Sequence, residues 1–298
     1  MPTDCHWVQH AAGRACVPTQ IERLVTLDTT SFENAVALGL QPIATVDTHR
    51  FNSLLEEHLA DVVNLGQVDE PNIERVLTLK PDLILMLDYQ PALYAQVSQI
   101  APTIFIEFEH SGLWKEVFRE YSRVLGREDI GQQVLDNYDR RLQEFKQQRE
   151  AEQQGNLTSS LQVSAIRIYP DRVNLYFRES FPGTVLDDAG LSRPEGQDIT
   201  ASEARRRYQN PIQASISLEQ LDQADGDVIF VWIAQGEIVE EETAQQRLAK
   251  LQANPLWRGL KAVQNNQIYV VPSYWVGNGP LAAKAMIDDL FKYLLEDS

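Results

Sequence analysis

The sequence predicts an α/β protein of two lobes, each a mainly parallel sheet flanked by helices, joined by one long α-helix. Three observations predict this fold class. Short apolar segments alternate with helical ones on both sides of residues 113–154. Residues 113–154 are predicted to be helical except near Gly126, and the part from 128 onward would span about 40 Å at about 1.5 Å per residue. The expected strands are continuously apolar, which is typical of parallel sheets covered on both faces.

The long helix is predicted from apolar residues that recur at helical spacing, with charged residues on the other sides. The apolar positions are Ile130, Val134, Tyr138, Leu142 and Phe145. With no helical partner directly after it, this segment is interpreted as a strut between two lobes. The expected domains are an N-terminal arm at 1–20, a lobe at 21–112, the helical strut at 113–154 and a second lobe at 155–298.

The first lobe starts with an apolar strand, and Thr29-Thr30-Ser31 is a helix-start cluster with a partial capping box from Ser31 to Asn34. Residues 47–59 are less regular. Asn72 is the expected cap of a later helix, which a Lys80-Pro81-Asp82 turn follows. The expected elements are strand 21–28, helix 32–38, strand 42–46, helix 72–79, strand 83–87, helix 90–100 and strand 103–106.

The second lobe resumes the alternation after a polar stretch that contains Gly155. Residues 192–215 show no clear period and are predicted to be a mobile loop. The basic run Arg205–Arg207 in that loop is either solvated or a flap over an anionic ligand. The expected elements are strands 162–169 and 173–177, helix 185–189, helix 217–224, strand 228–233, helix 241–251, strand 267–271 and helix 281–295.

The two halves resemble each other around two glutamates. Ile73-Glu74-Arg75-Val76-Leu77 precedes the strand at 83–87, and Leu218-Glu219-Gln220-Leu221 precedes the strand at 228–233. The favourable interaction of a carboxylate with a helix N-terminus explains either glutamate alone. Their common position suggests two homologous lobes with matched surface points.

Composition narrows the function classes. The chain has 298 residues, 43% of them hydrophobic and 23% charged, and a formal net charge of −17. Two domains of ordinary size fit this length. The negative charge argues against nucleic acid and anionic membranes as partners. No apolar run approaches a transmembrane helix, and no signal peptide is recognised.

The only cysteines of the sequence, Cys5 and Cys16, lie close together near the N-terminus. A disulfide between them would contribute about 3 kcal/mol on the entropic model, and it favours an oxidising compartment. The alternatives are a buried pair of free thiols and a metal site with His6 and His10. The Cys/His spacing matches no strong zinc pattern.

Three stretches resemble the periplasmic substrate-binding proteins of ferric-siderophore ABC importers: NIERVLTLKPDLIL, YFRESFPGTVLDDAGLSRP and YWVGNGPLAAKAMIDDLFKYL. The resemblance covers residues 20–298 and leaves out the Cys5–Cys16 arm. It implies two α/β lobes joined by one long helix, with the ligand between them, in a periplasmic protein that is expected to be a monomer. Lipid anchoring is left open. The resemblance also implies that Glu74 and Glu219 meet basic pockets on the permease dimer in the inner membrane.

Ligands of such proteins lie at strand ends, so basic and aromatic residues there are the candidates. A ferric siderophore already surrounds its iron with oxygen donors, and the protein must supply cations and flat rings. An arginine in a strand of an acidic protein is unusual because an unpaired buried charge is costly. Internal pairing is the alternative for such an arginine, and core packing for the tryptophans. The candidates are Arg167, Tyr169, Tyr176, Arg178, Trp232, Tyr274 and Trp275, with Thr30, Arg50 and Tyr89 on the first lobe.

The expected function is therefore delivery of a ferric siderophore, of hydroxamate or mixed citrate–hydroxamate type, to an ABC importer. Neither a cofactor nor a resident metal is expected, and ferric iron enters only within the siderophore. Cobalamin, haem and free ferric iron held by tyrosines are the other binding candidates. An enzyme on the same scaffold is the competing class. However, the G-x-G-x-x-A match at 277–282 lies too near the end of the sequence for a dinucleotide fold, and the sequence has no G-x-S-x-G, Walker A or H-E-x-x-H motif.

Overall fold

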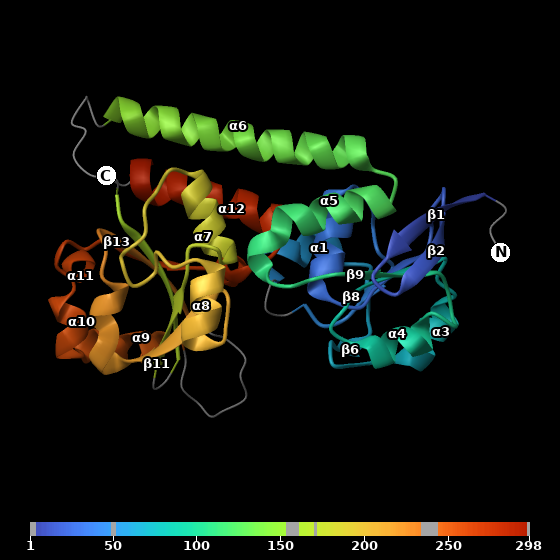
Figure 1. The fold of residues 1–298 in the computed structure, drawn as a ribbon, viewed down its shortest axis with the longest axis horizontal. Coiled ribbons are helices and arrows are strands. Elements are labelled where there is room, and N and C mark those ends of the chain that lie inside the picture. Colours follow the sequence, from blue (N-terminus) through green and yellow to red (C-terminus); the bar gives the residue numbers. More distant parts are fainter. Residues whose placement is uncertain (1–3, 49–51, 153–160, 170–171, 234–243, 297–298) are drawn as a thin grey trace. The chain divides into compact units, whose positions relative to one another are not determined.

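The computed structural model describes residues 4–48, 52–152, 161–169, 172–233 and 244–296 (Figure 1). The chain divides into two compact units. Unit 1 comprises Met1–Glu109, Leu113–Tyr138 and Asn278–Leu281, and unit 2 comprises His110–Gly112, Asp139–Gly277 and Ala282–Ser298. Each unit contains a five-stranded sheet flanked by helices, which confirms the predicted fold class.

The sheet of unit 1 is parallel throughout, in the order β5-β4-β3-β8-β9. All five residues of β8, the inner strand between β3 and β9, are buried, as expected for a strand with helices on both faces. The first predicted strand, 21–28, is limited to three residues. The strands are β3 (Leu24–Thr26), β4 (Ala44–Thr45), β5 (Val63–Asn64), β8 (Leu83–Leu87) and β9 (Thr103–Ile106).

The helices in the first half of the chain are α1 (Thr29–Ala37), α2 (Asn52–Leu59), α3 (Ile73–Leu79), α4 (Pro91–Val97), the 3₁₀ turn η2 (Ser111–Leu113) and α5 (Trp114–Val124). A small antiparallel pair, β6 (Gly66–Gln67) and β7 (Glu70–Pro71), precedes α3. Asn72 caps α3 as predicted, with its side chain accepting from Arg75 N at 2.8 Å. The prediction for α1 was wrong in detail. Asp28 is the cap, accepting from Ser31 N at 2.7 Å, and Ser31 already belongs to the helix.

The N-terminal arm is an antiparallel hairpin of β1 (Cys5–His10) and β2 (Gly13–Pro18). A disulfide joins Cys5 to Cys16, with 5.6 Å between their Cα atoms, so the predicted pairing is confirmed. Because both thiols are used in this bond, the alternative of a cysteine–histidine metal site is wrong. The tip of the hairpin is attached to β9 by a hydrogen bond from Ala11 N to Phe105 O at 3.0 Å.

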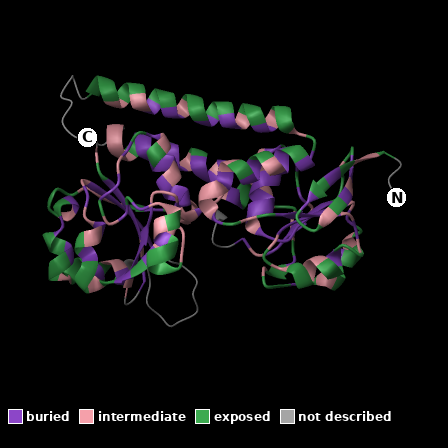
Figure 2. Cartoon of the chain, viewed as in Figure 1, coloured by how far each residue is buried: buried purple, intermediate pink, exposed green. Residues whose placement is uncertain are grey.

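The predicted strut consists of α5 and the 25-residue helix α6 (Glu128–Glu152). Gly126 separates the two helices with a positive φ of 63°, a conformation that favours glycine. One stripe of α6 is buried and the rest is largely exposed (Figure 2). The buried stripe includes Tyr138, Leu142 and Phe145. Helix α6 belongs to unit 1 up to Tyr138 and to unit 2 from Asp139, so one long helix joins the units.

The sheet of unit 2 is mixed, in the order β12-β11-β10-β13-β14. Strands β10, β13 and β14 are parallel, whereas β11 runs antiparallel to both β10 and β12. One face is apolar and forms the core with helices from the second half of the chain. The strands are β10 (Val163–Ile168), β11 (Arg172–Tyr176), β12 (Gln213–Ser217), β13 (Val228–Ile233) and β14 (Ile268–Val271).

Residues 192–215 contain a helix, so the prediction of a mobile loop was wrong. Helix α8 occupies Ala201–Tyr208 and is capped by Thr200, but Ala204 is its only buried residue. A single buried position leaves no periodic pattern to recognise. The remaining helices are α7 (Phe181–Asp188), η3 (Leu218–Ala224), α9 (Ala244–Ala253), α10 (Pro255–Gly259), α11 (Lys261–Gln264), η4 (Ser273–Val276), α12 (Pro280–Phe291) and the π-helical turn η5 (Lys292–Glu296). Within the described ranges, no helix is long and apolar enough to cross a membrane.

Candidate functional site

The two faces of the unit 2 sheet differ in chemistry. Residues paired across neighbouring strands point to the same face, and successive residues alternate between faces. Ile166 and Val231 point into the apolar core. Their neighbours Arg167 and Trp232 are paired with each other and therefore share the opposite face. This face, which we call the arginine–aromatic face, consists of Ala165, Arg167, Tyr169, Arg172, Asn174, Tyr176, Phe230 and Trp232.

Arg167 lies among the rings of this face. The carbon of its guanidinium lies 4.1 Å from the centre of the Trp232 ring and 4.4 Å from that of Tyr169. Both distances fit cation–π contacts. Arg167 also hydrogen-bonds the Tyr176 hydroxyl. Burial raises the pKa of Tyr176 strongly, and the charge of Arg167 only partly opposes this, so the hydroxyl stays protonated at neutral pH. The face thus combines a held cation with a hydroxyl donor and flat rings.

Arg172 is a second cation on this face, and we did not predict it from the sequence. Its guanidinium carbon lies 4.3 Å from the centre of the Tyr169 ring, so Tyr169 contacts both Arg167 and Arg172. Asn174 lies on the same face of β11 as Arg172 and Tyr176. Its side chain hydrogen-bonds Ser215 at 2.6 Å and Gln213 at 3.2 Å. The alternation of polar residues along 172, 174 and 176 was the signal that could have identified this row.

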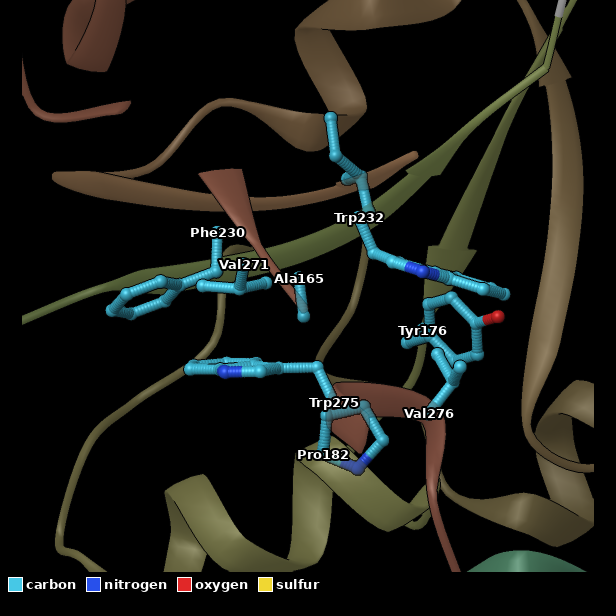
Figure 3. Close-up of a pocket in the computed structure, with 9 residues that line it drawn as sticks. Ala165, Tyr176, Pro182, Phe230, Trp232, Val271, Trp275 and Val276 are labelled. Carbon is cyan, nitrogen blue, oxygen red and sulfur yellow. The ribbon is translucent and has the colours of Figure 1, made fainter. Parts of the chain in front are cut away.

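A small pocket, partly open to solvent, lies beside these residues. Figure 3 shows the Trp232 indole beside the Tyr176 ring, and the Phe230 ring over the indole of Trp275. The Phe230 and Trp275 rings are stacked at 4.2 Å with 30° between their planes. The lining is largely apolar and aromatic, which suits the organic shell of a ligand. It consists of Ala165, Ile166, Tyr176, Pro182, Phe230, Trp232, Val271, Trp275 and Val276.

Tyr274 and Trp275 were predicted from their position after β14. Both side chains are held by hydrogen bonds to Asp289. Trp275 is only 2% exposed, and its indole nitrogen donates to Asp289 at 2.7 Å. The Tyr274 hydroxyl donates to the same carboxylate oxygen at 2.8 Å. Trp275 therefore forms the wall of the pocket through its ring, while its polar edge is used inside the protein. Burial and the negative charge of Asp289 raise the pKa of Tyr274 strongly.

Arg178 lies apart from Arg167. Because β11 runs antiparallel to β10, Arg178 lies four residues beyond the partner of Arg167, roughly 13 Å along the sheet at about 3.3 Å per residue. Its guanidinium forms an ion pair with Asp198 at 3.0 Å, and both side chains are partly exposed. The sequence placed the two arginines on adjacent strands but did not reveal that the strand direction separates them.

A buried polar network ties residues 193–197 to the strands behind the pocket. Arg193 is 5% exposed and donates to Val163 O at 2.6 Å and to Tyr176 O at 2.7 Å. It also donates to Gln197, whose side-chain oxygen accepts from Ala165 N at 3.1 Å. Burial lowers the pKa of Arg193 to about 9, and the charge of Asp198 opposes that shift. The hydrogen bonds of Arg193 and Gln197 thus fix the backbone of two pocket residues, Tyr176 and Ala165, through uncharged acceptors. Nothing in the sequence pattern indicated this network.

In unit 1, Thr30 and Tyr89 both interact with a buried carboxylate, Asp28, that we did not predict from the sequence. Asp28 is 3% exposed and accepts from Ser31 N and Leu87 N, which ties the start of α1 to the end of β8. Thr30 also donates its backbone N–H to Asp28. Burial raises the pKa of Asp28 to about 6. Tyr89 is about half exposed, and its pKa is raised first by burial and then by the charges of Asp28 and Asp69.

Three further predicted residues remain. Arg50 lies outside the described residues. Glu74 is exposed in the first turn of α3, and Glu219 is exposed in the first turn of η3. The two glutamates thus occupy equivalent positions before a buried strand in each unit. In the described part of the chain, no three His, Cys, Asp or Glu side chains gather as a metal site.

Comparisons with known proteins agree with this architecture. The family model described as "Periplasmic binding protein" matches residues 24–275. The probable siderophore-binding lipoprotein YfiY of Bacillus subtilis is 30% identical over 97% of this chain and 87% of its own. The achromobactin-binding periplasmic protein of Dickeya dadantii is 27% identical over 90% of this chain and 85% of its own.

Among solved structures, Staphylococcus aureus SirA complexed with staphyloferrin B superposes with a TM-score of 0.81 at 24% identity, covering 97% of this chain and 98% of SirA. At this identity the likeness shows the fold alone. The family model, by contrast, spans most of the chain. The family and the relatives of this chain are substrate-binding proteins rather than enzymes. The chain belongs to the periplasmic binding protein family.

Proposed function

We propose that this protein captures a ferric siderophore, of hydroxamate or mixed citrate–hydroxamate type, and delivers it to an ABC importer. The observation that carries the proposal is the position of Arg167, with its guanidinium 4.1 and 4.4 Å from two aromatic rings on the arginine–aromatic face. Flat rings hold the guanidinium in place, and a guanidinium recognises planar oxygen pairs such as carboxylates through its N–H groups. A ferric siderophore presents such oxygens around its iron.

The charge of the face favours the citrate-containing members of this ligand class. Arg167 and Arg172 contact the same Tyr169 ring, so two cations lie close together in a chain of net charge −17. A bound carboxylate would be attracted to both cations. Tyr176 adds a hydroxyl that stays protonated, and Trp232 adds a ring for stacking. In unit 1, we propose Thr30 and Tyr89 as ligand contacts.

Several relatives support this ligand class through what they bind. They include an Fe(3+)-citrate-binding protein, an iron(3+)-hydroxamate-binding protein and the siderophore-binding lipoprotein, all of Bacillus subtilis. The iron in such ligands is cargo and needs no protein ligand of its own. We propose that the protein acts in the periplasm as a monomer and binds one ferric complex without changing it.

For delivery, we propose that Glu74 and Glu219 dock on the permease dimer of the importer. Both are exposed, and both lie in the first turn of a helix, where a carboxylate needs no internal partner. Arginines on a membrane partner would form charge-assisted hydrogen bonds with them. Neither glutamate belongs to the arginine–aromatic face, so docking and binding can be tested independently.

The test is a titration followed by tryptophan fluorescence, with ferric citrate, ferric staphyloferrin B, ferric Desferal, cobalamin and haemin as ligands. We expect one-to-one quenching by a ferric siderophore, because Trp232 lines the proposed site and an iron complex quenches an indole in contact with it. The ligand recovered afterwards should be chemically unchanged. Preferential binding of cobalamin or haemin, or release of an altered product, would contradict the proposal.

A further inference from the structure

The side chain of Asp289 connects the pocket wall to the C-terminal helix. Asp289 lies in α12 and is 9% exposed. One of its oxygens, Oδ2, accepts hydrogen bonds from the Trp275 indole at 2.7 Å and from the Tyr274 hydroxyl at 2.8 Å. Two neighbouring side chains of η4 are thus held by a single carboxylate oxygen fourteen and fifteen residues further along the chain.

Burying the Asp289 carboxylate costs stability, so the arrangement calls for a compensating benefit. Burial raises the pKa of Asp289, while the bonds from Trp275 and Tyr274 and the charge of Lys292 oppose that shift. A well-packed apolar residue at this place would avoid the cost of burying a carboxylate. The benefit lies in geometry, because two charge-assisted bonds to one atom fix two side chains in direction as well as distance.

The orientation of the Trp275 ring matters because its face belongs to the pocket. The ring is stacked on Phe230 at 4.2 Å, and both residues line the pocket beside Tyr176 and Trp232. Stacking alone permits an indole to slide and turn in its plane. A hydrogen bond at the indole nitrogen removes that freedom, so the position of the pocket wall depends on Asp289.

We propose that Asp289 is a positioning residue of the ligand pocket, which sets the orientation of Trp275 and through it the affinity for the ligand. The ligand part of this inference rests on the function proposed above. The part that concerns the orientation of Trp275 does not, because it can be measured on the protein without ligand.

The experiment is a double-mutant cycle. Asp289→Ala is measured in the parent protein and in the Trp275→Phe background, by near-ultraviolet circular dichroism and by affinity for ferric staphyloferrin B. We expect Asp289→Ala to remove the part of the indole signal that Trp275 contributes, which the Trp275→Phe variant defines, and to weaken binding about tenfold, the effect of losing about one net hydrogen bond to a charged group. In the Trp275→Phe background, the same change should alter affinity less than about twofold, since residues that act through one another are not additive.

Two variants make the result decisive. Asp289→Asn keeps one oxygen acceptor without the charge, and it should restore most of the indole signal that Asp289→Ala loses. Asp288→Asn is the matched control, because Asp288 is the exposed neighbour that pairs with Arg141 at 3.2 Å. It should leave both signal and affinity unchanged. If Asp289→Ala fails to fold, the comparison of Asp289→Asn with Tyr274→Phe and Trp275→Phe still decides the role.

A pH titration separates positioning from a merely structural role. The groups that face Asp289 are Tyr274, Lys292 and Asp288, and of these only Asp288 is a second carboxyl group. Acidification should therefore bring the indole signal of the parent protein and of Asp288→Asn to the level of Asp289→Asn, whose own signal should not change. Additive effects in the cycle, or an unchanged indole signal in Asp289→Ala, would overturn the proposal. If the parent protein binds no ferric complex, the proposed function fails, while the circular dichroism still decides the role of Asp289.

Discussion

Replacing Arg167 by Met tests the arginine–aromatic face most sharply. Methionine keeps most of the side-chain length and its apolar contacts but removes the charge and every N–H group. The change deletes cation–π contacts with Trp232 and Tyr169, each worth about 0.5–2 kcal/mol depending on burial. It also removes the cost of holding a guanidinium away from water, which acts in the opposite direction. We therefore expect the free energy of unfolding to change by less than about 1 kcal/mol.

Ligand binding should respond far more strongly. A hydrogen bond that involves a charged group contributes about 1.5–3 kcal/mol, so losing the Arg167 contact should raise the dissociation constant about 10- to 150-fold for an anionic ferric siderophore. Arg178→Met should have a smaller effect, because that guanidinium already pairs with Asp198. Arg258→Met is the matched control. Its exposed guanidinium, on α10, donates to Ala253 O at the end of α9, away from the proposed site.

The assay is isothermal titration with ferric citrate and ferric staphyloferrin B, alongside urea unfolding of each variant. We expect the order of affinity to be Arg258→Met equal to the parent, then Arg178→Met, then Arg167→Met. A folded Arg167→Met protein that binds like the parent would refute the assignment of the face. An equal loss for Arg258→Met would show that total charge, rather than the local site, controls affinity.

Three further predictions concern the hairpin, the buried aspartate of unit 1 and the docking residues. Replacing Cys5 and Cys16 by Ala should lower the free energy of unfolding by about 3 kcal/mol in urea titration without changing ligand affinity. Unchanged stability would show that the disulfide does not stabilise the protein. The raised pKa of Asp28 means that the folded state takes up a proton before the unfolded state does, so the contribution of Asp28 to stability is present below its unfolded pKa and is lost as pH rises through about 6. Relative to Asp28→Asn, the parent should therefore gain about 2–3 kcal/mol between pH 7 and pH 4, and parallel pH profiles for the two proteins would contradict this. The double change Glu74→Arg and Glu219→Arg should abolish iron uptake in cells and leave the affinity of the purified protein intact, whereas normal uptake would remove the docking role.

The sequence was sufficient for the parts of the fold that depend on periodicity. The spacing of Tyr138, Leu142 and Phe145 predicted α6, and all three are buried. The continuous apolar run 83–87 predicted a strand covered on both faces, which is β8. These predictions succeed because burial of one stripe, or of every residue, leaves a repeat in the sequence.

The remaining features depend on contacts between residues distant in the sequence. Helix α8 buries only Ala204, so it leaves no repeat. Arg193 looked like a loop residue, yet carbonyl groups from two strands hold it inside the protein. Arg172 and Arg178 are both close to Arg167 in the sequence, and only the antiparallel register decides that Arg172 shares its site. The candidate site was therefore predicted in its residue types and in part of its membership.

The crystal structure of the protein with a bound ferric siderophore is the measurement that tests the account most directly. Anomalous scattering at the iron edge would locate the metal independently of any assumption about the ligand. We predict one iron position, with ligand oxygens in hydrogen-bond contact with the Arg167 guanidinium and with the organic shell against Trp232. Iron bound away from this face, or coordinated directly by protein side chains, would contradict the account.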